Sequence, residues 1–139
     1  MSDQPALAEF LEARLAEDWE AATASITTVG DTWEASGSVV EIEGDTKGRS
    51  VFEWTVCFDE GAPSEAQADH IARHDPARVL REVAAKRRIM EFAEKVDALA
   101  ETVFQEFSNH PEADGVALLK MLALPYADHP DFDPNWSTT

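Results

Sequence analysis

Near the start of the chain, apolar residues recur at helical spacing. Six of them follow one another at intervals of mostly three or four positions: Leu7, Phe10, Leu11, Leu15, Trp19 and Ala22. Acidic residues fill many of the positions between them, which is typical of a helix with one apolar face. Poor helix formers dominate from Thr23 to Val29, and Gly30 then interrupts the chain. The pattern predicts an N-terminal helix over residues 5–23.

Strand-forming residues dominate the next region. Three short segments, separated by glycine-containing loops, are rich in β-branched and aromatic residues: 32–35, 39–43 and 51–58. In the third segment the alternate residues would share one face of a strand: Phe52, Trp54, Val56 and Phe58. An aromatic face opposite a polar one is typical of an antiparallel sheet with one face packed on helices. We therefore expect antiparallel strands within residues 32–58.

Two helix starts follow the strands. Ser64 with Gln67 three residues later has the pattern of a capping box, which predicts a short helix over residues 65–74. Pro76 disfavours a helical Asp75 and suits the first position of a new helix, whose free amides the Asp75 side chain can cap. A second helix is therefore expected to begin at residue 76.

That second helix should be long, because residues 76–107 contain no Gly or Pro. Its apolar residues repeat at intervals of 4, 3, 4, 3 and 4: Ala85, Ile89, Phe92, Val96, Leu99 and Val103. A single helix over this range would be about 48 Å long, whereas a compact chain of this length has a radius of gyration of about 14 Å. The apolar residues would then be available to a homodimer or another protein partner. The alternative is a break near residues 95–97 that gives two ordinary helices.

The remaining pattern completes a single α+β domain over residues 1–139. A short helix is expected over residues 114–122, followed by a proline-containing, extended tail over residues 125–139 whose Trp136 either docks on the domain or binds a partner. We expect a small antiparallel sheet of about three strands, covered by the N-terminal helix and the long central helix.

Charge and cysteine content restrict the partners and the setting. With 28 acidic and 11 basic residues, the net charge is −17, which repels nucleic acid and anionic lipid. A single cysteine, Cys57, cannot form an internal disulfide, and the sequence has neither a leader pattern nor an apolar run near 20 residues. These features predict a cytoplasmic protein that binds neither nucleic acid directly nor a membrane.

The charge is unevenly distributed. Residues 73–95 hold seven basic and four acidic residues, a net charge of +3, so the remainder carries −20. Four arginines in this segment are candidates for binding an anion or an acidic partner: Arg78, Arg81, Arg87 and Arg88. The alternative is that they pair with carboxylates of this chain or of a second subunit.

Three histidines form a candidate metal site. His70 and His74 are four residues apart and would share one face of a helix, a spacing that presents two imidazoles to a metal ion. His129 is the candidate third ligand, with Asp128 or Asp131 as a neighbouring carboxylate. The alternative is that each histidine has a structural role, so that no cofactor is needed; a divalent metal is the cofactor that the residues would allow.

Two longer strings carry a family resemblance. They are HIARHDPARVLREV followed by KRRI, within residues 70–89, and LALPYADHPD at residues 122–131. These strings resemble a family of small actinobacterial and actinophage proteins known as domain of unknown function 6221. The resemblance implies a host range and no activity. Similar proteins often carry Cys and His between the strings, where residues 92–117 of this chain offer only His110.

Three functions follow from these features. The leading hypothesis is a non-enzymatic protein-interaction module, because the sequence has a long apolar stripe and none of the familiar nucleophile, phosphate-loop or dinucleotide motifs. The first alternative is a metal-dependent enzyme that uses His70, His74 and His129. The second is an acidic inhibitor that imitates the phosphates of DNA and binds a DNA-binding enzyme.

Overall fold

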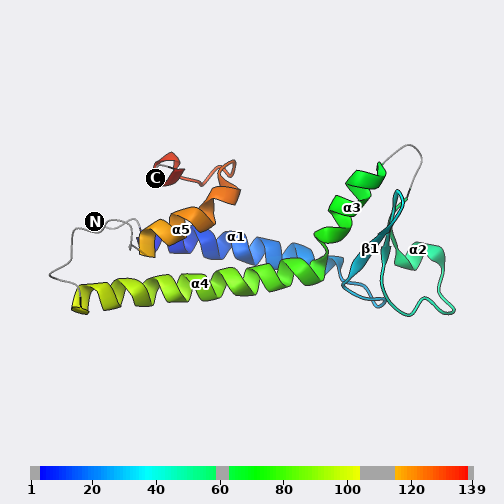
Figure 1. Cartoon of the computed structure of the whole chain (residues 1–139), viewed down its shortest axis with the longest axis horizontal. Coiled ribbons are helices and arrows are strands. Elements are labelled where there is room, and N and C mark those ends of the chain that lie inside the picture. Colours follow the sequence, from blue (N-terminus) through cyan, green and yellow to red (C-terminus); the bar gives the residue numbers. More distant parts are fainter. Residues whose placement is uncertain (1–3, 59–62, 104–114, 138–139) are drawn as a thin grey trace. The chain divides into compact units, whose positions relative to one another are not determined.

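The computed structural model describes residues 4–58, 63–103 and 115–137. It has the predicted α+β class, with a small three-stranded antiparallel sheet among helices (Figure 1). The elements in chain order are α1 (Gln4–Ser25), β1 (Trp33–Ser36), β2 (Val39–Ile42), α2 (Val51–Trp54), β3 (Thr55–Cys57), α3 (Glu65–Arg73), α4 (Pro76–Val103), α5 (Gly115–Ala123), and the 3-10 helices η2 (Leu124–Tyr126) and η3 (Pro134–Ser137).

The packing divides the chain into two compact units. We call residues 1–17 with 83–139 the helical unit, and residues 18–82 the sheet unit. Both α1 and α4 contribute residues to each unit. In the described part of the chain, no helix combines the length and the apolar character that crossing a membrane requires.

The sheet has strand order β1-β2-β3. A two-residue turn joins β1 to β2, with Ser36 paired to Val39, and its first residue, Gly37, has a φ of 62° that glycine adopts without strain. After β2 the chain passes close to itself, because a Cβ on Gly44 would lie 2.4 Å from the carbonyl oxygen of Val29. Glycine is therefore required at residue 44 for this approach.

Helix α3 packs on the sheet. Its Ala68 and Ala72, four residues apart and buried, contact the buried Val40 of β2, and partly buried side chains surround this core: Trp33, Ala35, Val56, Cys57 and Ile71. From the sequence, we expected the N-terminal and long helices to cover the sheet. In the structure, the helical contacts of this core come from α3. Two alanines on one helix face let the backbone approach the sheet closely, which explains why a helix of nine residues is sufficient.

The expectation of a continuous strand over residues 51–58 is wrong. Residues 51–54 form the single helical turn α2, and only Thr55–Cys57 pair with β2. The Ser50 hydroxyl accepts a hydrogen bond from the Phe52 amide, and the Glu53 carboxylate accepts one from the Ser50 amide at 2.7 Å. This capping box outweighs the strand propensity of its apolar residues, so Phe52 is 79% exposed instead of packing on an aromatic face.

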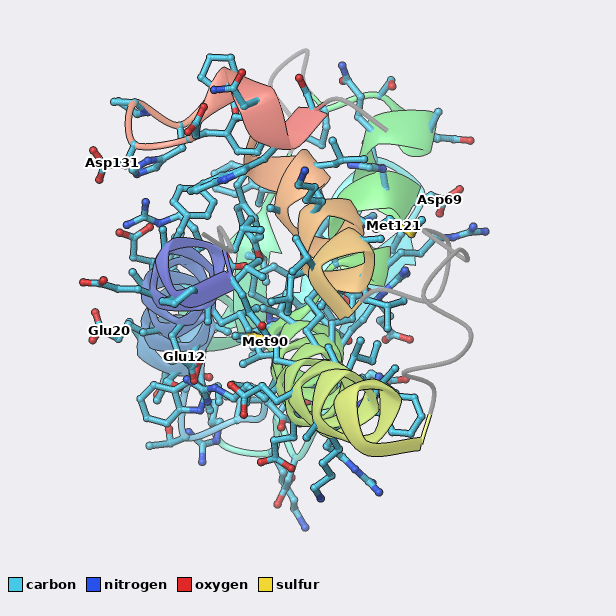
Figure 2. All side chains as sticks on the ribbon, turned by 90° about the vertical axis from the view of Figure 1, so that its left-hand side faces the viewer. Glu12, Glu20, Asp69, Met90, Met121 and Asp131 are labelled. Carbon is cyan, nitrogen blue, oxygen red and sulfur yellow. The ribbon has the colours of Figure 1, made fainter. Side chains whose placement is uncertain are left out.

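Helix α4 runs without interruption from Pro76 to Val103, a length of about 42 Å. It passes through residues 95–97, where the alternative placed a break, and residues 104–107 lie outside the described part. In the helical unit it packs beside α1 and α5 (Figure 1). All three helices contribute buried aliphatic side chains to this core: Leu7, Leu11 and Leu15 of α1, Val83 and Met90 of α4, and Leu119 of α5. Figure 2 shows Met90 among these helices.

Asp75 connects the first strand to the start of α4. Asp75 is only 7% exposed. Its carboxylate accepts hydrogen bonds from the Arg78 amide at 2.8 Å and from the Trp33 amide at 3.2 Å. The Ala77 amide donates to the Asp31 carbonyl at 3.0 Å, so a second bond joins the same two segments. The predicted cap is therefore present, and it also holds the beginning of β1.

Replacing Asp75 by Ala should lower the free energy of unfolding by about 2–4 kcal/mol, because both the helix cap and the acceptor of the Trp33 amide are lost. Asp75→Asn keeps one acceptor and should cost less. Urea denaturation followed by circular dichroism measures both variants. The control is Asp69→Ala, which removes an exposed carboxylate of α3 and should change stability by less than about 0.5 kcal/mol. Equal effects of the two alanine variants would contradict this role for Asp75.

Candidate functional site

The predicted dimer residues lie on α4 in the helical unit. Ile89 is 40% exposed, Phe92 is 61% exposed, and Val96 is partly buried. We call these three residues the outer stripe. The side chains of Leu99 and Val103, two further members of the predicted repeat, lie outside the described residues.

A neighbouring face of the same helix carries apolar residues that are buried. Val83, Met90 and Ala93 are 2%, 8% and 0% exposed and belong to the core of the helical unit. The helix therefore has two apolar surfaces, one packed within the unit and one presented to solvent. An apolar side chain as large as Phe92 that is mostly exposed on a regular helix marks a candidate contact surface.

The four candidate arginines do not form a single anion site. Arg78 bonds to Glu82 at 2.8 Å and to the Arg73 carbonyl at 3.1 Å, within the sheet unit. Arg87 bonds to Glu12 at 3.2 Å, within the helical unit. The other two, Arg81 and Arg88, are exposed, and no carboxylate in the described ranges pairs with them.

His70 and His74 are neighbours at the end of α3. Their ring centroids are 4.4 Å apart with an angle of 41° between the ring planes. His74 Nδ1 lies 2.8 Å from the His70 carbonyl oxygen. Because a carbonyl only accepts, His74 Nδ1 carries the proton of this bond.

His129 belongs to the helical unit and has partners there. Its Nδ1 lies 2.8 Å from Arg14 Nη1 and 3.1 Å from the Asp131 amide, and both of these groups are donors. His129 Nδ1 therefore accepts, which places the ring proton on Nε2. Across residues 4–58, 63–103 and 115–137, no group of three or more His, Cys, Asp or Glu side chains is arranged to hold a metal ion.

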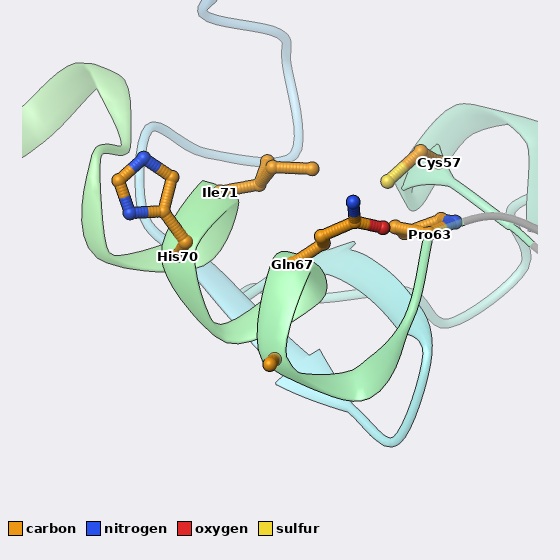
Figure 3. A pocket seen from close by; sticks show the side chains of 6 residues that line it. Cys57, Pro63, Gln67, His70 and Ile71 are labelled. Carbon is orange, nitrogen blue, oxygen red and sulfur yellow. The ribbon is translucent and has the colours of Figure 1, made fainter.

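A shallow pocket of about 630 Å³ lies in the sheet unit, beside β3 and α3. Its lining is mainly apolar: Cys57, Pro63, Ala66, Gln67, His70 and Ile71. Figure 3 shows the Cys57 thiol facing Gln67 and Ile71, with the His70 ring at the far end of the same pocket. The arrangement therefore does not place the thiol beside an imidazole that could activate it.

The C-terminal residues form an aromatic cluster around Phe10. Four rings lie between 5.2 and 6.4 Å from the Phe10 ring, measured between centroids: Tyr126, His129, Phe132 and Trp136. Trp136 is only 6% exposed, so it docks on its own chain, as one of the two expectations had it. The tail is not simply extended, because η2, η3 and the turns between them fold residues 124–137 over α1.

Arg14 is the residue in this cluster that the sequence analysis missed. Its side chain is 9% exposed; the guanidinium carbon lies 5.1 Å from the centre of the Phe10 ring, and Nη2 donates to Glu17 at 2.8 Å. Arg14 Nε is buried and has no hydrogen-bond partner among the described residues. The available signal was its position on the apolar face of the predicted helix, one turn after Phe10.

A model of a family of unknown function, DUF6221, matches residues 4–138. The chain belongs to this family. Neither the curated proteins nor the solved structures contain a match to the DUF6221 chain.

Both strings that resemble the DUF6221 family have structural roles in this member. The string at 70–89 contains the helix-capping Asp75 and the adjacent histidines His70 and His74. The string at 122–131 contributes Tyr126 and His129 to the cluster around Phe10. Residues of the first string therefore cap the start of α4 in the sheet unit, and residues of the second string pack against Phe10 in the helical unit.

The bond between Arg14 and His129 should contribute to the stability of the helical unit. Arg14→Met and His129→Phe should each lower the free energy of unfolding by about 1–3 kcal/mol, because each removes one partner of a part-buried hydrogen bond made by a charged group. The double variant should lose less than the sum, giving a coupling of at least about 1 kcal/mol in urea denaturation.

A matched control comes from the exposed pair of Glu12 and Arg87, which joins α1 to α4 in the same unit. The cycle of Glu12→Gln and Arg87→Met should give a coupling below about 0.5 kcal/mol, because water screens the pair. Equal coupling energies in the two cycles would contradict the larger stabilisation that we assign to the part-buried pair of Arg14 and His129.

Proposed function

We propose that the protein is a non-enzymatic interaction module that binds a second copy of itself through the outer stripe. The observation that carries this proposal is the exposure of Ile89 and Phe92 on a helix whose other apolar face is already packed. Burying a side chain such as that of Phe92 contributes about 1.5–3 kcal/mol, which favours a partner surface over solvent.

The spacing of the stripe supports a second copy as the partner. Intervals of three and four residues keep Ile89, Phe92 and Val96 on one line of the helix, as in helices that pair along their length. A surface that is apolar along one line is complementary to itself under two-fold symmetry. The described stripe is short, so the dimer should be weak, with a dissociation constant on the order of micromolar.

Charge along α4 supports an antiparallel pairing. Basic residues at 86–88 precede Ile89, whereas three acidic residues, Glu91, Glu94 and Asp97, outnumber Lys95 further along. An antiparallel two-fold arrangement brings the basic turn of one copy toward the acidic turns of the other. A parallel arrangement would align like charges, which disfavours it.

The setting that we infer for this module is the cytoplasm of actinobacteria or of hosts infected by their phages. The two strings at 70–89 and 122–131 support the origin, and the single Cys57 in an acidic chain supports a reducing compartment. Finding the same strings mainly in chains from other bacterial groups would contradict the inferred origin.

Phe92→Glu should convert the dimer to a monomer, because a carboxylate on the outer stripe would be buried without a partner in the dimer. Sedimentation equilibrium between about 1 and 500 μM measures the loss as at least a tenfold weaker association, which corresponds to about 1.4 kcal/mol. Circular dichroism should be unchanged, since Phe92 is exposed in the single chain.

The matched control is Met121→Glu. Met121 is 58% exposed on α5 of the same unit and lies outside the stripe, so this variant adds the same charge and should associate as the original chain does. An original chain that is monomeric at the highest concentration, or equal weakening by both variants, would overturn the proposed dimer.

A further inference from the structure

We propose that the end of α3 is a binding site for a divalent transition-metal ion, with His70 and His74 as its two protein ligands. This site lies in the sheet unit, and it does not depend on the outer stripe of the helical unit. It also differs from the three-histidine site expected from the sequence, because His129 has no part in it.

The two imidazoles are already neighbours. They come from positions four apart at the end of one helix, and their ring centroids are 4.4 Å apart. A metal ion holds imidazole nitrogens at about 2.0–2.1 Å, so two nitrogens bound to one ion lie roughly 3–3.5 Å from each other. Neighbouring rings at this separation can reach that geometry by rotation of the His70 side chain, which is exposed, while His74 keeps its hydrogen bond.

The hydrogen bond of His74 prepares one ring for metal binding. Because His74 Nδ1 donates to the His70 carbonyl oxygen at 2.8 Å, the lone pair of the neutral ring is on Nε2. Metal-binding histidines usually have this arrangement, in which the second ring nitrogen donates to a carbonyl or a carboxylate and fixes the ring. Within the described ranges, the His70 ring makes no hydrogen bond and contacts the His74 ring.

Electrostatics also favour a cation here. The carbonyl groups at the carboxyl end of a helix carry partial negative charge, and His70 and His74 lie at that end of α3. The net charge of −17 raises the local concentration of cations around the whole chain. Two arginines oppose a cation at this helix end: Arg73, whose side chain is exposed, and Arg78, whose Nη1 donates to the Arg73 carbonyl oxygen at 3.1 Å.

The ligand type limits the ion. Imidazole nitrogen binds Zn²⁺, Ni²⁺ and Cu²⁺, whereas Mg²⁺ and Ca²⁺ prefer oxygen. Two protein ligands leave the remaining coordination positions to water or to a donor from another molecule. The site should therefore bind its ion reversibly, with Cu²⁺ tightest among the three.

Calorimetric titration of the full chain without an affinity tag, with ZnCl₂, NiCl₂ or CuCl₂, tests the site. One ion should bind per chain, and MgCl₂ should give no binding. His70→Ala and His74→Ala should each weaken binding by more than about tenfold, since even the partners of metal ligands contribute 10- to 100-fold.

A composition-matched control separates a paired site from scattered imidazoles. The double variant Asp69→His with His70→Asp keeps every residue type, but it places the two histidines five positions apart, on different helix faces, and should lose binding as the single variants do. His110→Ala removes a histidine outside the described residues and should bind as the original chain does.

A spectroscopic readout locates the ion. Substoichiometric Cu²⁺ should broaden the nuclear magnetic resonance signals of His70 and His74 before those of His129. Absence of one-to-one binding, retained affinity in either single variant, or broadening that begins at His129 would overturn the proposal. These readouts use variants of His70 and His74 and leave the outer stripe unchanged, so failure of the site is distinguishable from failure of the dimer.

Discussion

The buried carboxylate of Asp75 is the constraint on which the start of α4 depends. A carboxylate removed from water is costly unless its oxygens are hydrogen-bonded, and here one oxygen accepts from the Arg78 amide and the other from the Trp33 amide. The first bond ends the turn after α3 and begins α4, and the second holds β1 at that point. One side chain therefore fixes the junction of a strand with a helix of 28 residues.

The two apolar faces of α4 follow from packing within the helical unit. Met90 and Ala93 are buried with α1 and α5, and Ile89 and Phe92, which neighbour them in sequence, lie around the helix on a different face. Folding of the single chain therefore buries one apolar face of α4 and leaves the outer stripe exposed. In the same unit, Phe132 and Trp136 of the C-terminal tail pack against Phe10 of α1 and are buried, so these aromatic residues stabilise the unit and are not exposed to a partner.

Local sequence signals predicted the secondary structure correctly where a short segment carried a single signal. Ser64 with Gln67 and Asp75 with Pro76 gave the starts of α3 and α4 correctly, because capping is decided by residues three positions apart. The segment 51–58 failed because it contains two signals: alternating apolar residues that favour a strand and a capping box at Ser50 and Glu53 that favours a helical turn. Of the candidate site, helical spacing alone predicts that the outer-stripe residues share one line of the helix and that His70 and His74 are adjacent, but it does not predict that the stripe is exposed.

The sequence by itself determined the α+β class, the long helix and the repeat on its surface, since periodicity and capping act within a few residues. Only the tertiary structure decided which face of that helix is buried, that Arg14 and His129 share a hydrogen bond, and that α3 packs on the sheet. These features join residues as far apart as 14 and 129, and the strength of such a contact depends on burial and distance in space. No spacing along the chain encodes either quantity.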